Sequence, residues 1–282
     1  INIYGNQTGL DAGVKLSGAG VTVSGKNITL YGKSSTGNGV LLSGSTLSGA
    51  YLNATGFTNT GYTGFAWQGG TINTTGTNGT STASVIKGIS AASTTASNGY
   101  GALMMIANSA TNAASGTTLT LAGEATTLTT GQNIKERGIL VQGGYALSAS
   151  GDITLDGSSK SSEGMAFGGT INMATVAGVT NKLTLKGTSA ASSNAGLSAV
   201  NFSGVINGND ATSSINILGT ATNTSGASWD NAINIAGAIN GGGAPNIIIQ
   251  STGAKIQTSA AITGANISID NTNGTINTTA GA

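Results

Sequence analysis

This chain of 282 residues has few side chains that could carry out acid–base chemistry, because it holds only nine acidic residues and no histidine. The closest approach to a catalytic pair is Asp152 and Asp156, with Glu163 beyond them. Thr154 lies between the two aspartates in a predicted strand, so both carboxylates should project from one side, about 13 Å apart. Glycosidases hold their two carboxylates about 5 to 9.5 Å apart. The sequence therefore predicts that the chain is not an enzyme and that these acids are solvating charges.

Metal and cofactor binding are not predicted either. The chain has no cysteine and no histidine, which removes the usual zinc ligands. The glycine cluster GGGAPN from Gly241 lacks the aspartate that calcium-binding nonapeptide repeats use. The densest group of charges is Lys135, Glu136 and Arg137. We interpret that group as a solvated turn, with a contact site as the alternative, and expect no cofactor.

Four aromatic residues gather between Gly56 and Gly70, in a chain with only 4% aromatic residues. They are Phe57, Tyr62, Phe65 and Trp67. An exposed group of this kind can stack on sugar rings or on a receptor surface, which makes the four candidate contact residues. The alternative is that Phe65 and Trp67 face inward on a strand and fill a corner of the core.

Ten Asn-x-Ser/Thr sequences are candidate sites of N-linked glycosylation. About seven would arise by chance from the Asn, Ser and Thr content, so their number is weak evidence. If the chain is modified, we expect the sugar on sequons in turns, such as Asn78 and Asn273. Asparagines stacked in turns can instead form hydrogen-bonded ladders between coils. The ten sequons begin at Asn6, Asn27, Asn53, Asn73, Asn78, Asn201, Asn223, Asn266, Asn273 and Asn277.

The overall composition excludes several kinds of partner. Charged residues are 7% of the chain and the net charge is +1, so there is no electrostatic footprint for nucleic acid. No uninterrupted apolar stretch reaches the about 18 residues that a membrane-spanning helix needs. The chain opens on INIYG, already inside a strand pattern, and we interpret it as a segment or a processed form of a longer protein.

The carboxyl-terminal sequence repeats itself at a spacing of twenty residues. NIIIQSTGAKIQTSA from Asn246 matches NISIDNTNGTINTTA from Asn266. A period of about twenty, built from short apolar alternations and turn residues, is typical of a β-solenoid. Ile249 should therefore stack on Ile269 and Ile256 on Ile276 in the core.

A short alternating run closed by glycine recurs along the chain. Its first and third residues should point inward and its second outward, because side chains alternate along a strand. The glycine should allow a positive φ where the chain turns a corner. The runs include INIYG from Ile1, ITLYG from Ile28, LTLAG from Leu119, ITLDG from Ile153, LTLKG from Leu183 and INILG from Ile215. The outward column should be Asn2, Thr29, Thr120, Thr154, Thr184, Asn216, Ile248 and Ser268.

A second recurring element follows each run after a loop of variable length. Its copies include GVKLSG from Gly13, GVLLSG from Gly39, GILVQGG from Gly138, GMAFGG from Gly164 and AVNFSG from Ala199. The spacing of the first element, longer than twenty in most of the chain, is interpreted as one coil plus an inserted loop. Residues 1–282 should form one all-β domain, a parallel β-solenoid of about ten to twelve coils. A short helix over 100–114 is the main local alternative to strand.

The stretch ITLYGKSSTGNGVLLSGSTLSG, from Ile28 to Gly49, resembles the stalk repeats of filamentous-haemagglutinin-type exoproteins of two-partner secretion. Within that family the repeats look most similar to those of high-molecular-weight adhesins. The resemblance implies a right-handed parallel β-helix, export through an outer-membrane transporter, and an extracellular location on the bacterial cell surface.

Two classes of function follow as expectations. The first is a non-catalytic adhesin or stalk segment, a rod for attachment or aggregation whose partner is a host-cell or bacterial surface receptor or glycan. The second is a structural subunit that associates end to end into an extracellular fibre or surface layer. A nucleic-acid partner is expected for neither.

Overall fold

The computed structural model describes residues 1–59, 62–76, 82–91, 101–106, 108–126, 136–173, 180–190, 197–208, 213–222, 231–241, 245–272 and 274–278. Every regular element in these residues is a β-strand, and the pairings are parallel throughout. The strand interpretation of 100–114 is confirmed for its described residues by β7 (Gly101–Met105) and β8 (Ser109–Ala113). Within the described part of the chain, no helix has the length and hydropathy to cross a membrane.

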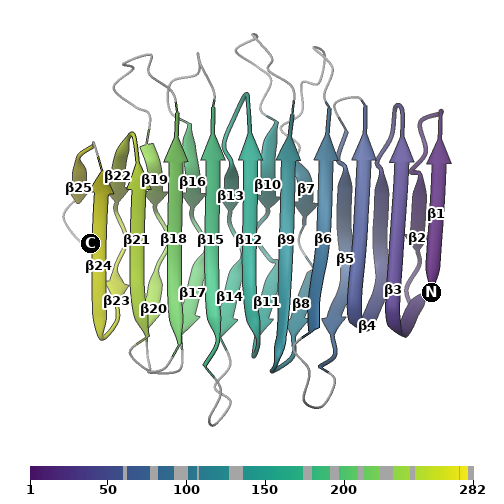
Figure 1. Ribbon diagram of the computed structural model, residues 1–282, viewed down its shortest axis with the longest axis horizontal. Helices are drawn as coiled ribbons and strands as arrows, with labels where there is room; N and C mark the ends of the chain where they lie inside the picture. The colour runs from purple at the N-terminus through teal and green to yellow at the C-terminus, as the bar shows by residue number, and fades with distance from the viewer. Residues whose placement is uncertain are drawn as a thin grey trace.

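The chain winds as a right-handed parallel β-helix, as expected. In Figure 1 it runs up the front of the molecule, returns down the back in two steps, and advances from the amino-terminal to the carboxyl-terminal end. Each coil therefore contributes strands to three faces. We call the front face A, the upper back face B and the lower back face C.

Face A holds the longest strands, ten in register. Two of them, the ends of β3 and β4, belong to elements that continue without a break from one face to the next, as β5 does between faces B and C. The strands of face A are β1 (Asn2–Gln7), the end of β3 (Thr22–Ser34), the end of β4 (Val40–Thr58), β6 (Thr82–Ser90), β9 (Thr117–Ala125), β12 (Asp152–Ser159), β15 (Lys182–Ser189), β18 (Ser214–Ala221), β21 (Asn246–Thr252) and β24 (Asn266–Thr272).

The two back faces hold shorter strands. Face B is the start of β4, the start of β5 (Phe65–Thr74), β2 (Val14–Ser17), β7 (Gly101–Met105), β10 (Arg137–Val141), β13 (Met165–Phe167), β16 (Ser198–Phe202), β19 (Asn231–Ile235), β22 (Lys255–Thr258) and β25 (Ile276–Thr278). Face C is the start of β3, the middle of β4, the end of β5, β8 (Ser109–Ala113), β11 (Ala146–Ala149), β14 (Thr170–Met173), β17 (Val205–Gly208), β20 (Ile239–Gly241) and β23 (Ile262–Thr263).

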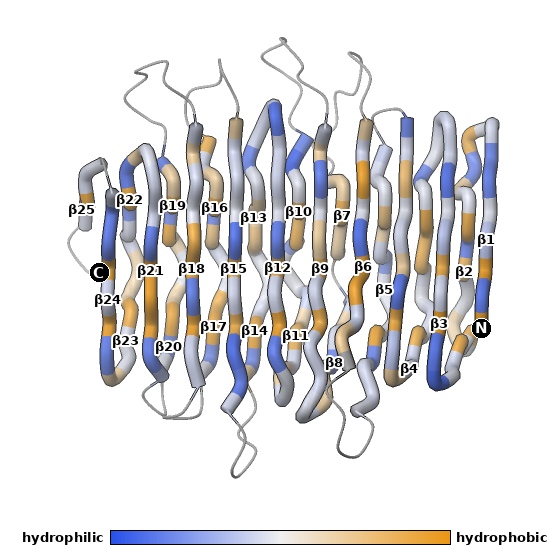
Figure 2. Tube along the Cα trace, viewed as in Figure 1, coloured by the Kyte–Doolittle hydropathy of each residue, from blue (hydrophilic) through white to orange (hydrophobic). Residues whose placement is uncertain are grey.

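The core is a set of stacked apolar columns, one coil above the next. On face A the predicted inward residues are buried wherever a coil lies on both sides, as with Ile153 and Leu155, both at 0% exposure. Figure 2 shows the resulting alternation along the front strands. Burying each such side chain stabilises the fold by about 1.5 to 3 kcal/mol. Since no coil can bury its own apolar residues, the stack is the unit of stability.

The predicted outward column on face A is confirmed by the strand register. Thr120, Thr154 and Thr184 are successive partners, and Thr184 is followed by Asn216. The register adds two members that the repeat pattern missed, Asn53 and Val85. Their coils lack the apolar residues that mark the other copies, because the inward positions there include Ala54 and Ser84.

The glycine that closes each run has a different role from the predicted one. It has no positive φ, so it does not turn a corner. In β9, a Cβ at Gly123 would lie 1.9 Å from the carbonyl oxygen of Gly138, which begins the strand opposite. The same clash occurs in other coils, for example between Gly32 and Gly39. The glycine is therefore needed because faces A and B converge there until their backbones touch.

Positive φ occurs instead in the second recurring element. Gly18, Gly44 and Gly69, at the corner between faces B and C, have φ of 123°, 67° and 81°. These conformations are open to glycine and strained for other residues.

The coil length is twenty at the carboxyl end and longer elsewhere. The side-chain bond between Asn246 and Asn266 joins residues 20 apart, whereas Asn207 and Asn240 are 33 apart. Both coils carry the same three strands, which confirms the interpretation as one coil plus inserted residues. Stacking of Ile249 on Ile269 and of Ile256 on Ile276 is confirmed.

Candidate binding surfaces

Several carboxylates of faces A and B are engaged by neighbouring coils. Asp156 pairs with Lys186 at 3.0 Å, one strand away. Asp152 accepts a hydrogen bond from the backbone N–H of Lys182 at 2.8 Å. Glu163 pairs with Arg137. In the part of the chain that the structure describes, no three acidic side chains gather into a group that would hold a metal ion.

The solvated-turn interpretation of the charge cluster is wrong for Glu136, which is 3% exposed. Its Oε1 lies 3.5 Å from the hydroxyl of Ser90, and its Oε2 has no hydrogen-bond partner among the described residues. Burial raises the pKa of Glu136 to about 7, and the Ser90 bond offsets only part of this rise. Arg137 does not neutralise Glu136, since it is bound to Glu163. Lys135 lies outside the described residues.

Glu163 is the second buried carboxylate, at 3% exposure, and it is fully engaged. Besides its pairing with Arg137, its Oε1 accepts a hydrogen bond from Nδ2 of Asn201 at 2.7 Å. This places one of the predicted sequon asparagines inside a polar cluster rather than free on the surface. The cluster joins neighbouring coils of face B.

Two of the four candidate contact aromatics lie inside the core. Phe65 and Trp67 are 0% and 1% exposed, so the inward reading is confirmed for them and they are not available as contact residues. Trp67 packs edge-on against Tyr145, whose ring in turn meets Phe167 at 6.5 Å between centroids. The phenol of Tyr145 bonds Thr111, and burial raises its pKa. Phe57 and Tyr62 lie at the surface.

A different group of aromatic residues lies on the outward side of face A. Tyr4, Tyr31 and Tyr51 are 67%, 42% and 41% exposed. Tyr4 and Tyr31 are register partners on β1 and β3. The ring of Phe57 lies under the ammonium of Lys33, 5.5 Å from its centroid. We call Tyr4, Tyr31, Tyr51, Phe57 and Lys33 the tyrosine face.

The tyrosine face is flat, cationic and slightly hollowed. A depression of about 390 Å³ lies between Tyr4, Tyr31 and Lys33. The outward positions of β1, β3, β4 and β6 on face A include no acidic residue. Along the outward side of face A, the first acidic residue is Glu124 on β9, which pairs with Lys87 at 2.9 Å. Sequence reasoning missed this surface because Tyr4 and Tyr31 are far apart in the chain and meet only through the register, in which Tyr51 lies on the next strand level with Asn27.

Seven of the ten sequons fall on described residues. Asn6, Asn27, Asn53, Asn266 and Asn277 are exposed, and Asn73 and Asn201 are half-buried. Asn78, Asn223 and Asn273 lie outside the described residues. The expectation that sugar prefers Asn78 and Asn273 therefore stays a prediction.

Asparagine ladders between coils are present, as the alternative interpretation proposed. On face C, Asn112 donates to Asn73 at 2.8 Å, and Asn240 donates to Asn207 at 3.1 Å. On face A, Nδ2 of Asn266 donates to Oδ1 of Asn246 at 2.9 Å. The asparagines of these ladders lie in strands rather than in turns. They align the register of successive coils with uncharged groups, in keeping with the low charge of the chain.

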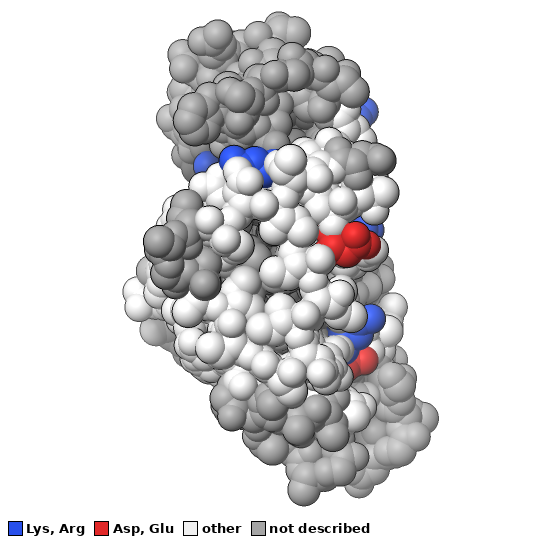
Figure 3. Space-filling view, turned by 90° about the vertical axis from the view of Figure 1, so that its left-hand side faces the viewer, with Lys and Arg blue, Asp and Glu red and all other residues white. Residues whose placement is uncertain are grey.

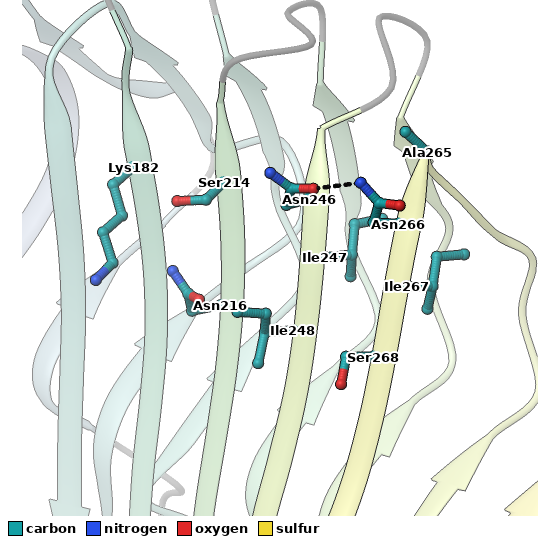
Figure 4. Close-up of a pocket in the computed structure, with 10 residues that line it drawn as sticks. All are labelled: Lys182, Ser214, Asn216, Asn246, Ile247, Ile248, Ala265, Asn266, Ile267 and Ser268. Carbon is teal, nitrogen blue, oxygen red and sulfur yellow. Dashed lines mark hydrogen bonds between the residues drawn. The ribbon is translucent and has the colours of Figure 1, made fainter.

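A second hollow lies on face A at the other end of the rod, where β15, β18, β21 and β24 begin. It is a shallow groove of about 760 Å³, lined by Lys182, Ser214, Asn216, Asn246, Ile248 and Asn266 among others. We call it the carboxyl-terminal groove. Figure 4 shows the side chain of Lys182 extending along its strand towards the level of Asn216, and the Asn246–Asn266 pair lying above Ile248.

Asn216 is unusual among the residues of this groove. It occupies the position that threonine holds in the three preceding coils, and Ile248 follows it in the next. Asn216 is 8% exposed, yet its Nδ2 has no hydrogen-bond partner among the described residues. Ile248 beside it is 40% exposed. A buried donor thus faces the groove next to an open apolar surface.

Seen from the carboxyl-terminal end, the described surface of the rod is mostly uncharged, with a few scattered acidic and basic side chains (Figure 3). The inward residues of the last coil are open at this end, with Ile267 and Ile276 at 43% and 45% exposure. No protein-family model, curated protein or solved structure matches this chain significantly.

Proposed function

We propose that the chain is a non-catalytic segment of a bacterial cell-surface adhesin, and that its tyrosine face binds an extended surface polysaccharide. The observation that carries the proposal is the exposed aromatic group on a flat, parallel sheet. Ring faces of tyrosine stack on the apolar faces of sugars, and flanking polar groups bond their hydroxyls. An extended sugar chain can lie across β1, β3 and β4, whose strands are about 4.8 Å apart.

Charge supports the same partner. Lys33 holds its ammonium over Phe57 and has no acidic neighbour on the outward positions of the first four coils. This charge would attract acidic polymers, tolerate neutral ones and repel cationic ones. Export through an outer-membrane transporter and location outside the cell remain parts of this proposal.

Replacing the three exposed tyrosines together tests the proposal. We expect Tyr4→Ser, Tyr31→Ser and Tyr51→Ser in one chain to lower affinity for the bound polysaccharide at least tenfold, because each lost stacking contact costs about 0.5 to 1.5 kcal/mol. Affinity electrophoresis against a panel of neutral and acidic polysaccharides measures the change. Tyr62→Ser is the matched control, since Tyr62 is also 42% exposed but lies in the connection between β4 and β5.

Two outcomes would contradict the proposal: no polysaccharide in the panel is bound by the unchanged chain, or Tyr62→Ser weakens binding as much as the triple change. The exposed sequons Asn6, Asn27 and Asn53 share this surface, so sugar attached to them would cover it. Intact mass of the protein from its native source determines whether they are modified.

A further inference from the structure

We propose that the carboxyl-terminal groove is a separate binding site for an acidic sugar, with the sugar carboxylate between Lys182 and Asn216. The proposal does not depend on the tyrosine face, which lies on the first coils of the rod. It rests on three features of the groove: an unpaired cation, an unpaired buried donor and an exposed apolar side chain.

Lys182 supplies the positive charge. The described residues place no carboxylate within ion-pair distance of its ammonium. The carboxylate of Asp152, on the neighbouring strand, is held by the backbone N–H of Lys182 at 2.8 Å, and it forms no ion pair with the ammonium. Lys186 lies four residues further along β15, and by contrast it is paired with Asp156. An anionic group in the groove would therefore meet Lys182 as its partner.

Asn216 supplies a donor that the protein leaves unused. A buried N–H without a partner destabilises the protein, and a ligand oxygen would recover that cost. In the three preceding coils this position is a threonine, which fits the column without needing a further acceptor. A carboxylate oxygen accepts from both an ammonium and an amide, and such charge-assisted bonds are stronger than neutral ones.

The remaining walls suit the rest of a sugar ring. Ile248 offers an apolar surface on the next strand. Asn246 accepts from Asn266 through Oδ1, so its Nδ2 is left to donate towards the side of Ser214 (Figure 4). Ser214 adds a hydroxyl. Amide groups and a hydroxyl around an apolar patch match a sugar ring, whose hydroxyls lie at its rim. The single cation, Lys182, matches a sugar that carries one carboxylate.

The test uses an oligosaccharide of alternating glucuronic acid and N-acetylglucosamine, and the same oligosaccharide with its carboxyls reduced to alcohols. Binding is measured by calorimetry in a chain that carries Tyr4→Ser, Tyr31→Ser and Tyr51→Ser, so that stacking on the tyrosine face does not contribute. We expect the acidic form to bind at least tenfold more tightly than the reduced form. Lys182→Gln should remove that difference, and Lys186→Gln, with the same change of net charge, should keep it.

Asn216→Thr separates a binding role from a structural one. We expect it to raise the melting temperature, because it removes an unpaired buried donor and continues the threonine column, and at the same time to weaken binding of the acidic oligosaccharide severalfold. The proposal is overturned by equal binding of the two oligosaccharides, by no binding, or by equal losses in Lys182→Gln and Lys186→Gln. Unchanged binding in Asn216→Thr would remove Asn216 from the site. Failure of any of these leaves the tyrosine-face measurement unaffected, and the reverse also holds.

Discussion

The burial of a single residue in this rod depends on whether a neighbouring coil covers it. Glu136, in a stretch whose sequence suggests a solvated turn, is buried because faces A and B close over it near Ser90. Asn216 is buried because Ile248 of the next coil lies beside it. Neither environment is encoded near the residue itself, since Ser90 is 46 residues from Glu136 and Ile248 belongs to the coil after Asn216.

Glu136 should make the stability of the fold depend on pH. Its pKa is raised from 4.5 to about 7, so the folded state holds a proton that the unfolded state has lost between these values. Stability should therefore fall as the pH rises from about 4.5 to 7, by about 3 kcal/mol at most, and remain at the lower level above pH 7.

Melting temperatures from pH 4.5 to 8 measure this effect. Glu136→Gln should remove most of the slope and raise the melting temperature at pH 8. Glu124→Gln, which removes an exposed partner of Lys87, serves as the control and should leave the slope in place. A slope that persists in Glu136→Gln would show that another group carries the pH dependence.

At the scale of strands, the converging faces A and B set the strictest requirement on sequence. Gly123→Ala would place a Cβ 1.9 Å from the carbonyl oxygen of Gly138, and the backbone there has no room to move. We expect a loss of about 3 kcal/mol or more, above the usual cost of overpacking. Gly143→Ala is the control, because its Cβ would come no closer than 3.8 Å to the oxygen of Gly168. Denaturant unfolding of both variants would contradict this account if their stabilities were equal.

Much of the strand arrangement could be predicted from sequence, and the reason is local. The runs from Ile28, Ile153 and Leu183 carry their inward and outward positions in their own alternation, so their register follows directly. The role of the closing glycine could not be predicted, because it depends on the carbonyl of a strand on another face. The same reason applies to the aromatic segment. Alternation alone places Phe65 and Trp67 on the same side of the strand, but it does not determine whether that side faces the core or the solvent.

The binding surfaces are harder to predict than the fold. The tyrosine face places Tyr4 beside Tyr31 and has Tyr51 further along the next strand, and no sequence window contains all three. The carboxyl-terminal groove combines Lys182 with Asn216 and Ile248 from successive coils. Only the register, known once the loops between strands are placed, reveals that these side chains are neighbours.

For the whole molecule, stacking makes disruption local and dependent on position. Ile269 lies in the last described coil on face A and is only partly covered, contrary to the expectation of a fully stacked position. Ile269→Lys should fray β24 and β25 and leave the amino-terminal coils protected. Leu155→Lys, at a fully buried position in the middle of the rod, should open coils on both sides because an unpaired charge is buried there.

Hydrogen exchange distinguishes these outcomes. Thr154→Lys, one residue away on the outward side of β12, is the matched control and should change protection little. Equal loss of protection in Thr154→Lys and Leu155→Lys would contradict the inward and outward assignment. Global loss of protection in Ile269→Lys would contradict coupling between neighbouring coils alone.

The central claim is that the rod binds a sugar polymer without cutting it, and one incubation tests both halves of that claim. The unchanged chain is mixed with each polysaccharide of the panel, and the bound fraction is measured by sedimentation and the polymer length by size-exclusion chromatography. The account predicts that at least one polysaccharide sediments with the protein and that its length distribution stays constant with time. Shortening of the polymer, abolished by Asp152→Asn or Asp156→Asn, or the absence of any bound polysaccharide, would contradict it.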